Sequence, residues 1–286
     1  PGMRVGVNLT SIGVSADWWL ASARRLDEAG FDAVWCWDHF LSRGDPTDPV
    51  LECWTMLSAA AAVTERIHVG SLVTNVMNRH PSVLARMAAA VQQVADGRLE
   101  VGIGIGGFPR EHDHLGIPFP PAAERVEHLE EAVQVLRALW GGGPVSFEGR
   151  HYRLDRAHAF PVPVPPPRLI IGGETRAGAR LAARLGDAWT TDGAGLIRDR
   201  ASYLQALAAA ARRREDVSVL VLVDLDRHQP VAGQALVADL PGEMQRWAAE
   251  GADELIIGYV RPDQLDAVVA AGRQRSPGDR GTLAAP

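Results

Sequence analysis

The sequence alternates short apolar runs with longer segments of helical spacing along its whole length, and this alternation constrains the fold more than any other feature. Eight runs are apolar throughout, which is typical of parallel strands covered on both faces. They lie at residues 4–9, 33–38, 67–74, 99–105, 168–171, 188–191, 217–224 and 254–260. Eight such units in 286 residues predict an α/β fold of the (β/α)8 TIM-barrel type, with a doubly wound open sheet as the alternative.

Apolar spacing also predicts the helices that follow these strands. They lie at residues 17–29, 54–63, 82–95, 123–140, 176–185, 201–214, 241–250 and 262–271. The pattern is interrupted by an inserted Pro-rich loop and hairpin around residues 107–167, where 144–154 is expected to turn at Glu148 and Gly149. We expect one domain over residues 3–272 and a disordered tail over 273–286.

Composition excludes several classes of function. All 29 basic residues are Arg, so the chain cannot be an enzyme that needs a lysine amine, such as a Schiff-base or pyridoxal-phosphate enzyme, a P-loop NTPase or an ordinary protein kinase. The net charge of −6, with Arg spread along the chain, argues against a nucleic-acid or anionic-membrane partner. With two cysteines, no apolar run near the ~20 residues that span a bilayer and no signal pattern, we expect a cytoplasmic enzyme acting on a small molecule.

In a barrel, chemistry sits where strands end and the following loops begin. Asp38 and His39 come directly after the second run and place a carboxylate and an imidazole at that end. Histidine is the side chain best matched to proton transfer near neutral pH. The alternative is a helix-cap Asp beside a surface His. The large ring of the neighbouring Trp37 favours a functional pocket.

Glycine-rich segments follow two further strands. Residues 102–107 match the pattern G-x-G-x-x-G, but Phe108 and Pro109 stand where a dinucleotide site would begin its helix, so we expect no Rossmann site. The glycines instead indicate that backbone approaches a flat or bulky group. At 172–175, Gly-Gly-Glu-Thr before a helix suits a phosphate, with a tight turn capped by Thr175 as the alternative.

The cluster Glu111-His112-Asp113-His114 contains several metal-ligand types. These residues are adjacent in sequence, and no second spaced pair accompanies them. We therefore expect solvated loop residues and no bound metal. The alternative is a metal-dependent barrel hydrolase that uses His112, Asp113 and His114.

Six segments form an ordered set over nearly the whole chain: Trp-Asp-His-Phe at 37–40, Val-Thr-Asn at 73–75 with Arg-His-Pro at 79–81, Gly-Ile-Gly-Ile-Gly at 102–106, Gly-Ile-Pro-Phe-Pro-Pro at 116–121, Phe-Glu-Gly-Arg-His-Tyr at 147–152 and the Pro-rich entry to a strand at 165–173. Together they resemble the bacterial luciferase-like superfamily of barrel oxidoreductases. Within it they resemble the branch that uses the deazaflavin coenzyme F420.

The resemblance implies that His39 lies by the reactive carbon of the deazaflavin as a catalytic acid or base. It implies a non-proline cis peptide bond between Leu72 and Val73 that backs the ring. Expected contacts to the cofactor, including its phosphate, come from Asp38, His39, Leu72, Val73, Thr74, Asn75, Gly104, Ile105, Gly106, Gly107, Gly172, Gly173, Glu174 and Thr175. Some members carry an acidic proton donor where this chain has Gly107, and the nearest carboxylate, Glu111, is included as a candidate catalytic residue.

The sequence therefore predicts a coenzyme F420-dependent oxidoreductase that transfers a hydride between the deazaflavin and a small organic substrate. His39 would exchange a proton with the substrate, and Asp38 would set His39. The walls of the substrate pocket are assigned to Trp37, Trp54 and Phe108.

Three alternatives stay open: a monooxygenase that uses reduced FMN, the metal-dependent hydrolase, and a non-catalytic flavin-binding relative. The resemblance also implies a homodimer. A His39 imidazole that points outward to bulk water, far from the largest cavity, would contradict the main interpretation.

Overall fold

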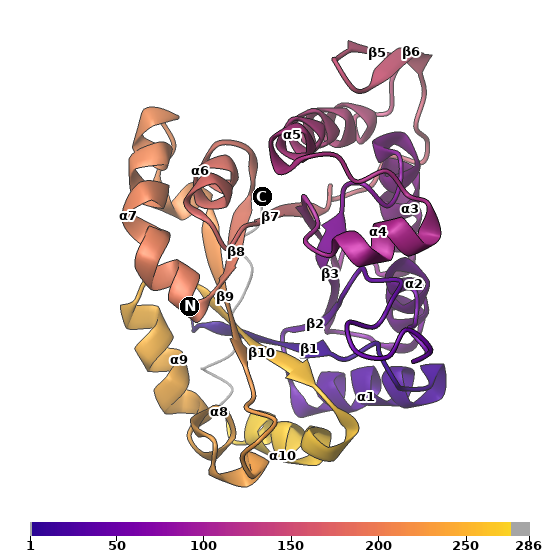
Figure 1. Cartoon of the computed structure of the whole chain (residues 1–286). Coiled ribbons are helices and arrows are strands. Elements are labelled where there is room, and N and C mark those ends of the chain that lie inside the picture. Colours follow the sequence, from indigo (N-terminus) through magenta and orange to yellow (C-terminus); the bar gives the residue numbers. More distant parts are fainter. Residues whose placement is uncertain (1, 276–286) are drawn as a thin grey trace.

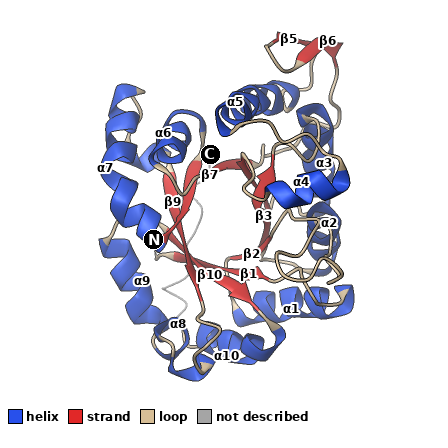
Figure 2. Ribbon diagram, in the orientation of Figure 1, coloured by secondary structure: helices blue, strands red, loops and turns tan. Residues whose placement is uncertain are grey.

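The computed structural model describes residues 2–275 and has a closed barrel of parallel strands inside a ring of helices (Figure 2). Neighbouring strands follow the order β1-β10-β9-β8-β7-β4-β3-β2. The strands are β1 (Arg4–Leu9), β2 (Ala33–Cys36), β3 (His68–Asn75), β4 (Leu99–Gly104), β7 (Arg168–Gly172), β8 (Ala188–Asp192), β9 (Ser218–Asp224) and β10 (Glu254–Val260). The predicted (β/α)8 barrel is confirmed, and the open-sheet alternative is wrong.

The helices that cover the barrel are α1 (Ala16–Ala29), α2 (Cys53–Val63), α3 (Pro81–Val94), α5 (Ala122–Leu139), α6 (Arg176–Leu185), α7 (Gly193–Ala209), α9 (Leu240–Ala249) and α10 (Pro262–Arg273) (Figure 1). Their ends follow from local chemistry. The Ser15 side chain accepts a hydrogen bond from the Trp18 amide and begins α1. Gly30, with φ of 82°, ends the same helix in the left-handed region that glycine tolerates.

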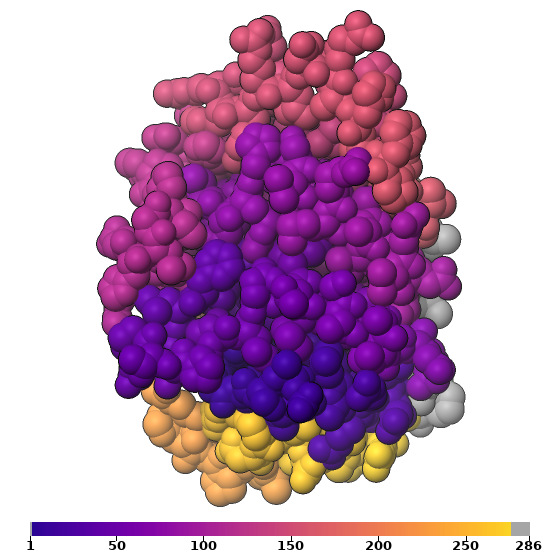
Figure 3. Space-filling model, turned by 90° about the vertical axis from the view of Figure 1, so that its right-hand side faces the viewer, coloured from indigo at the N-terminus to yellow at the C-terminus, as the bar shows by residue number. Residues whose placement is uncertain are grey.

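The insertion between β4 and β7 contains a short helix, α4 (Pro109–Leu115), before α5, and an antiparallel hairpin of β5 (Val145–Glu148) and β6 (Arg153–Ala157) after it. The hairpin projects beyond α5 in Figure 1. In Figure 3 it forms the top of the visible face, and residues of the N-terminal half of the chain occupy the middle of that face. The prediction of a loop at 109–115 was wrong, because Pro109 at the first position and left-handed Gly116 after the last delimit a helix.

Two other boundaries differ from the predictions. Helix α7 begins at Gly193 rather than at 201, because the Asp192 carboxylate caps it by accepting from the Gly195 amide. The prediction missed this start because glycine has a low helix propensity. At the other end of the chain, Arg273 belongs to α10, and Arg275 is buried with Nη2 2.8 Å from the Asp32 carboxylate. The expected disordered tail is therefore wrong for 273–275, and 276–286 lie outside the described residues.

Three short helical segments that were not predicted complete the described chain. They are η1 (Arg214–Asp216), η2 (Val231–Gly233) and α8 (Ala235–Ala238). No helix of the described part is long and apolar enough to cross a membrane.

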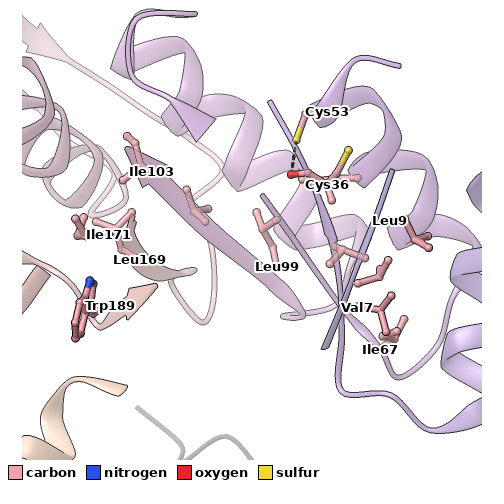
Figure 4. Close-up of a cluster of buried hydrophobic side chains, with 14 of the residues drawn as sticks. Val7, Leu9, Cys36, Cys53, Ile67, Leu99, Ile103, Leu169, Ile171 and Trp189 are labelled. Carbon is pink, nitrogen blue, oxygen red and sulfur yellow. Dashed lines mark hydrogen bonds between the residues drawn. The ribbon is translucent and has the colours of Figure 1, made fainter. Parts of the chain in front are cut away.

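Apolar side chains pack in two layers. The outer layer lies between strands and helices, and Figure 4 shows part of it, including the Cys53 thiol directed at the Cys36 carbonyl oxygen 3.5 Å away. The inner layer fills the barrel around Trp35, which is fully buried. A Cβ on Gly6 or Gly70 would come within 2.5 Å of the Trp35 ring, so these glycines make room for it.

Four buried charged side chains close the amino-terminal end of the barrel. Arg4 lies 2.6 Å from Glu100 and 2.9 Å from Glu254, and Arg168 lies 3.0 Å from Glu100 and 2.5 Å from Glu254. Each charge therefore has two partners of opposite sign, which offsets the cost of removing it from water.

Candidate active site

A cavity of about 710 Å³ opens at the carboxyl ends of the barrel strands. Its lining includes nearly all of the predicted cofactor residues: Asp38, His39, Leu72, Val73, Asn75, Gly104, Ile105, Gly106, Gly107, Gly172, Gly173, Glu174 and Thr175. The opposite end of the barrel holds a larger hollow of about 1270 Å³, lined by residues such as Arg4, Glu100 and Arg168. His39 does not line this larger hollow. It lines the cavity at the carboxyl ends of the strands, where barrel chemistry takes place, and its side chain is 21% exposed rather than turned outward to bulk water.

Val73 forms a bulge that projects into this cavity. The pairing of β3 with β4 shifts between Ser71 and Thr74, and the Leu72–Val73 peptide bond is cis, as the resemblance implied. A Cβ on Gly104 or Gly172 would lie 2.8 or 2.9 Å from a methyl group of Val73. The glycines of the G-x-G-x-x-G segment thus accommodate the bulge, and they do not form a dinucleotide turn.

Asp38 is buried and forms a bidentate ion pair with Arg79. Both of its oxygens bind Arg79, at 2.7 and 2.8 Å, and Oδ2 also accepts from the Asn75 amide and the Asn78 side chain. This bidentate pair fixes the loop after β3 against the loop after β2. The prediction that Asp38 sets His39 is wrong, since the side-chain contacts of Asp38 in the described chain go to Arg79, Asn75 and Asn78 and not to His39.

Glu111, rather than Asp38, is the carboxylate that lies beside the His39 ring. Its carboxylate Oε2 lies 3.4 Å from His39 Nδ1 and accepts from the backbone amides of Phe40 and Leu41 at 2.5 and 3.0 Å. The sequence alone could not show this contact, because α4 carries Glu111 back over the loop after β2.

Burial alone would raise the pKa of the Glu111 carboxyl group, but the neighbouring His39 side chain and the hydrogen bond from the Phe40 amide outweigh it and hold that pKa below its usual value. The carboxylate is 1% exposed and stays ionised near neutral pH. Glu111 is therefore placed to orient and stabilise the His39 ring, and its lowered pKa favours this role over that of an acid.

The histidine cluster on α4 does not converge on a metal. His112 is buried, whereas Asp113 and His114 are exposed on other sides of the helix. Asn75 accepts from the Met77 amide through Oδ1, so its Nδ2 donates to His112 Nε2 at 2.8 Å and occupies that lone pair. The hydrolase alternative is wrong, and so is the expectation that all of these residues are solvated.

Three aromatic side chains stand around His39. Trp37 and Phe108 meet its ring edge-on, with ring centroids 5.5 and 6.0 Å apart, and Tyr259 stacks on Trp37 at 4.4 Å. Tyr259 has φ of 56°, in the left-handed region that side chains other than glycine rarely adopt. Sequence reasoning missed it, although its position at the end of the eighth strand was a usable signal.

Two predicted site residues face away from the cavity. Trp54 is 2% exposed on α2, and its Nε1 donates to Thr74 Oγ1 at 3.1 Å. Thr74 is fully buried and donates in turn to Ser71 Oγ. The predictions of a substrate wall from Trp54 and of a cofactor contact from the Thr74 side chain are wrong, because these groups bond each other behind the sheet.

The amino end of α6 borders the cavity opposite His39. The first amides of α6 have no partners inside the helix, because they begin it. The Thr175 side chain caps one of them, the Gly178 amide. Partial burial, and then the nearby Asp192 and Asp224 carboxylates, raise the pKa of Glu174. The first-turn amides of α6 thus suit one phosphate. The carboxyl groups of Glu174, Asp192 and Asp224 lie close to one another.

The residues present fit a flat ring cofactor that carries a phosphate. The cavity volume falls within the ~300–1,000 Å³ typical of such pockets. A Cβ on Gly107 would meet nothing within 4 Å, so the backbone there borders open space. The Val73 bulge supplies an apolar surface for a ring, and the α6 amides supply donors for a phosphate.

These features define a cofactor-binding (β/α)8 barrel whose site lies at the carboxyl ends of its strands. A family model described as luciferase-like monooxygenase matches residues 3–229. The chain belongs to this luciferase-like family.

The curated relatives that the chain matches are named for different reactions. The chain is 33% identical over 209 residues, 72% of its length, to an F420-dependent glucose-6-phosphate dehydrogenase of Beutenbergia cavernae, and spans 61% of that relative. It is 30% identical over 193 residues, 64% of its length, to the pyrimidine monooxygenase RutA of Allorhizobium ampelinum, and spans 52% of it.

A solved structure supports the fold over the full barrel. An F420-dependent secondary alcohol dehydrogenase, in complex with an F420-acetone adduct, superposes with a TM-score of 0.86 at 21% identity and covers 98% of this chain and 100% of its own.

Proposed function

We propose that this protein is a coenzyme F420-dependent oxidoreductase that moves a hydride between the deazaflavin and a small organic substrate. The observation that carries the proposal is the cavity at the carboxyl ends of the strands, with the Val73 bulge on one side and His39 at its mouth. The F420-dependent relatives support the same cofactor.

When bound, the deazaflavin supplies or accepts the hydride. Val73 and the backbone of 104–107 would hold the ring, and the segment 172–175 with the first turn of α6 would hold the phosphate. These residues would fix the ring with one edge toward His39, so that the hydride and the proton could be exchanged at neighbouring atoms of the same substrate.

His39 exchanges a proton with the substrate through the ring nitrogen that does not face Glu111. The ionised Glu111 carboxylate lies beside Nδ1 and stabilises a positive charge on the imidazole. Glu111 is accordingly a positioning residue, and His39 is the catalytic one.

The surroundings of the cavity favour a neutral, largely apolar substrate. Trp37, which lines the cavity, and Phe108 stand edge-on to His39, and Tyr259 stacks on Trp37. Arg43 is the one basic side chain among the residues that line the cavity in the described chain, and the carboxylate of Glu174 lies near it. We therefore expect secondary alcohols or the matching ketones to be turned over faster than a sugar phosphate.

The competing function is a monooxygenase that uses reduced FMN. The RutA relative, which is named a pyrimidine monooxygenase, supports the monooxygenase reaction. Reconstitution separates the two. Titration with F420 should quench its fluorescence to a one-to-one end point, and turnover of an alcohol should change F420 absorbance without oxygen uptake. Tight FMN binding with no F420 binding, and oxygen consumption during turnover, would overturn the proposal.

We also propose a homodimer with a cytoplasmic location. Ile197 and Leu204 lie seven residues apart on α7 and are 61% and 40% exposed, which gives that helix an apolar outer face. The free, buried thiols of Cys36 and Cys53 suit a reducing compartment. Sedimentation should give the mass of two chains, reduced to one by Ile197→Glu; a wild-type monomer would contradict the assembly.

A further inference from the structure

A cluster of two histidines and a glutamate lies outside the cavity, where α5 meets the hairpin. Glu124 and His128 are four residues apart on α5, so they share one face of the helix. His151 comes from the turn between β5 and β6. Each of the three residues offers one ligand atom, and these atoms lie within 4.8 Å of one another.

The turn that carries His151 is held in place by α5 itself. The Glu131 carboxylate accepts from three successive backbone amides, those of Arg150 at 2.7 Å, His151 at 3.0 Å and Tyr152 at 3.0 Å. This arrangement fixes the imidazoles of His151 and His128 next to each other, with ring centroids 3.9 Å apart. Nε2 of His151 also lies 2.9 Å from the Glu127 carboxylate Oε2. When Nε2 donates to Glu127, Nδ1 of the same ring keeps its lone pair for an ion.

A further contact suits His128 to metal binding. Its Nδ1 lies 3.0 Å from the Tyr152 hydroxyl group. When Nδ1 donates to that hydroxyl, Nε2 keeps its lone pair for an ion, and such outer partners are the usual companions of metal-bound histidines.

We propose that Glu124, His128 and His151 bind a divalent transition metal ion of the Zn²⁺ class. Two imidazoles and one carboxylate are the ligand set that Zn²⁺ favours over Mg²⁺ or Ca²⁺. Zinc–nitrogen bonds of about 2.0–2.1 Å require the ligand atoms to approach further by side-chain rotation, with water in the remaining position. The ion would fasten the hairpin to α5, independently of the cofactor site.

The test is calorimetric titration of the whole, tag-free chain with ZnCl₂ after dialysis against a chelator. We expect one Zn²⁺ per chain, with binding abolished in His128→Ala and in His151→Ala. Tyr152→Phe should weaken binding by about 10–100-fold, since it removes only the outer partner. The exposed His114 on α4 provides the matched control, and His114→Ala should bind as the wild type does.

A second readout is cobalt substitution. Co²⁺ at this site should give visible absorption bands that disappear in the same two variants, and Zn²⁺ should raise the melting temperature of the wild type but not of His151→Ala. Absence of saturable Zn²⁺ binding, or equal binding by the wild type and a His128→Ala/His151→Ala double variant, would overturn the proposal. Neither readout depends on F420.

Discussion

His39 and Glu111 are far apart in the sequence, yet together they determine what the mouth of the cavity can do. The imidazole side chain is 21% exposed toward the cavity, while the carboxylate behind it is 1% exposed. A carboxylate that remains ionised behind an imidazole is the arrangement by which proteins orient a general acid or base.

The first prediction concerns His39 itself. His39→Ala should cut turnover by ~10²–10⁴-fold, because it removes the group that exchanges the substrate proton. The affinity for F420 should stay within several-fold, because the ring is held by the backbone around Val73 and Gly104. Steady-state kinetics and fluorescence titration measure the two quantities. Undiminished turnover would instead show that the reaction does not use His39 as its acid or base.

The second prediction concerns the positioning role of Glu111. Glu111→Gln keeps an oxygen for the Phe40 and Leu41 amides but loses the charge beside His39. We expect kcat to fall by about 10–100-fold with KM and F420 affinity nearly unchanged, and Glu111→Asp to recover part of the loss. If KM and F420 affinity change as much as kcat, the residue is only a structural support.

How far the sequence predicted the site can be argued from Asp38 and its neighbours. Adjacency to a strand end correctly placed Asp38 and His39 at the cavity. The partners were missed: Arg79 for Asp38 and Glu111 for His39. Both come from other segments of the chain, and the position of α4 determines that the carboxylate beside the imidazole is that of Glu111. Sequence spacing carries no information about such contacts between loops.

At the scale of elements, strand β4 needs glycines because the neighbouring strand β3 approaches its backbone closely. A Cβ on Gly102 would lie 2.1 Å from the Ser71 carbonyl oxygen, which is backbone and cannot rotate away. Periodicity predicted the strands because apolar runs are a local signal. It missed α4 and the start of α7, because these depend on caps and on glycines that permit close packing rather than on apolar spacing.

The third prediction tests this packing. Gly102→Ala should lower the free energy of unfolding by about 1–3 kcal/mol, since the added methyl group overpacks the bulge. Gly107→Ala is the matched control in the same segment. Its Cβ would meet nothing within 4 Å, and we expect a change within about 0.5 kcal/mol. Thermal unfolding of both variants makes the comparison, and equal effects would contradict the assigned role of Gly102.

At the scale of the whole molecule, the charged network at the amino-terminal end makes stability depend on pH. Burial alone would raise the pKa of Glu100, but Arg4 and Arg168 outweigh it and lower that pKa to about 2. A carboxyl group whose pKa is lower in the folded state stabilises the fold above its unfolded value of 4.5, and this contribution is lost as the pH falls from there toward 2.

The fourth prediction follows from that sign. Glu100→Gln should destabilise the protein by about 3–5 kcal/mol at pH 7, because Arg4 and Arg168 lose a buried partner. The difference from the wild type should shrink below pH 4.5. Exposed Glu148 pairs with Arg153, and Glu148→Gln should change stability by less than about 1 kcal/mol. Melting temperatures at pH 7, 5 and 3.5 measure these effects, and a difference independent of pH would refute the mechanism.

The most direct test of the central claim is a crystal structure of the protein with F420 bound. The account predicts the deazaflavin ring against Val73 and the backbone of 104–107, its phosphate at the first turn of α6, and the His39 imidazole within reach of its reactive edge. A ring bound elsewhere, such as in the hollow at the amino-terminal end of the barrel, or a His39 side chain turned away from it, would contradict the account.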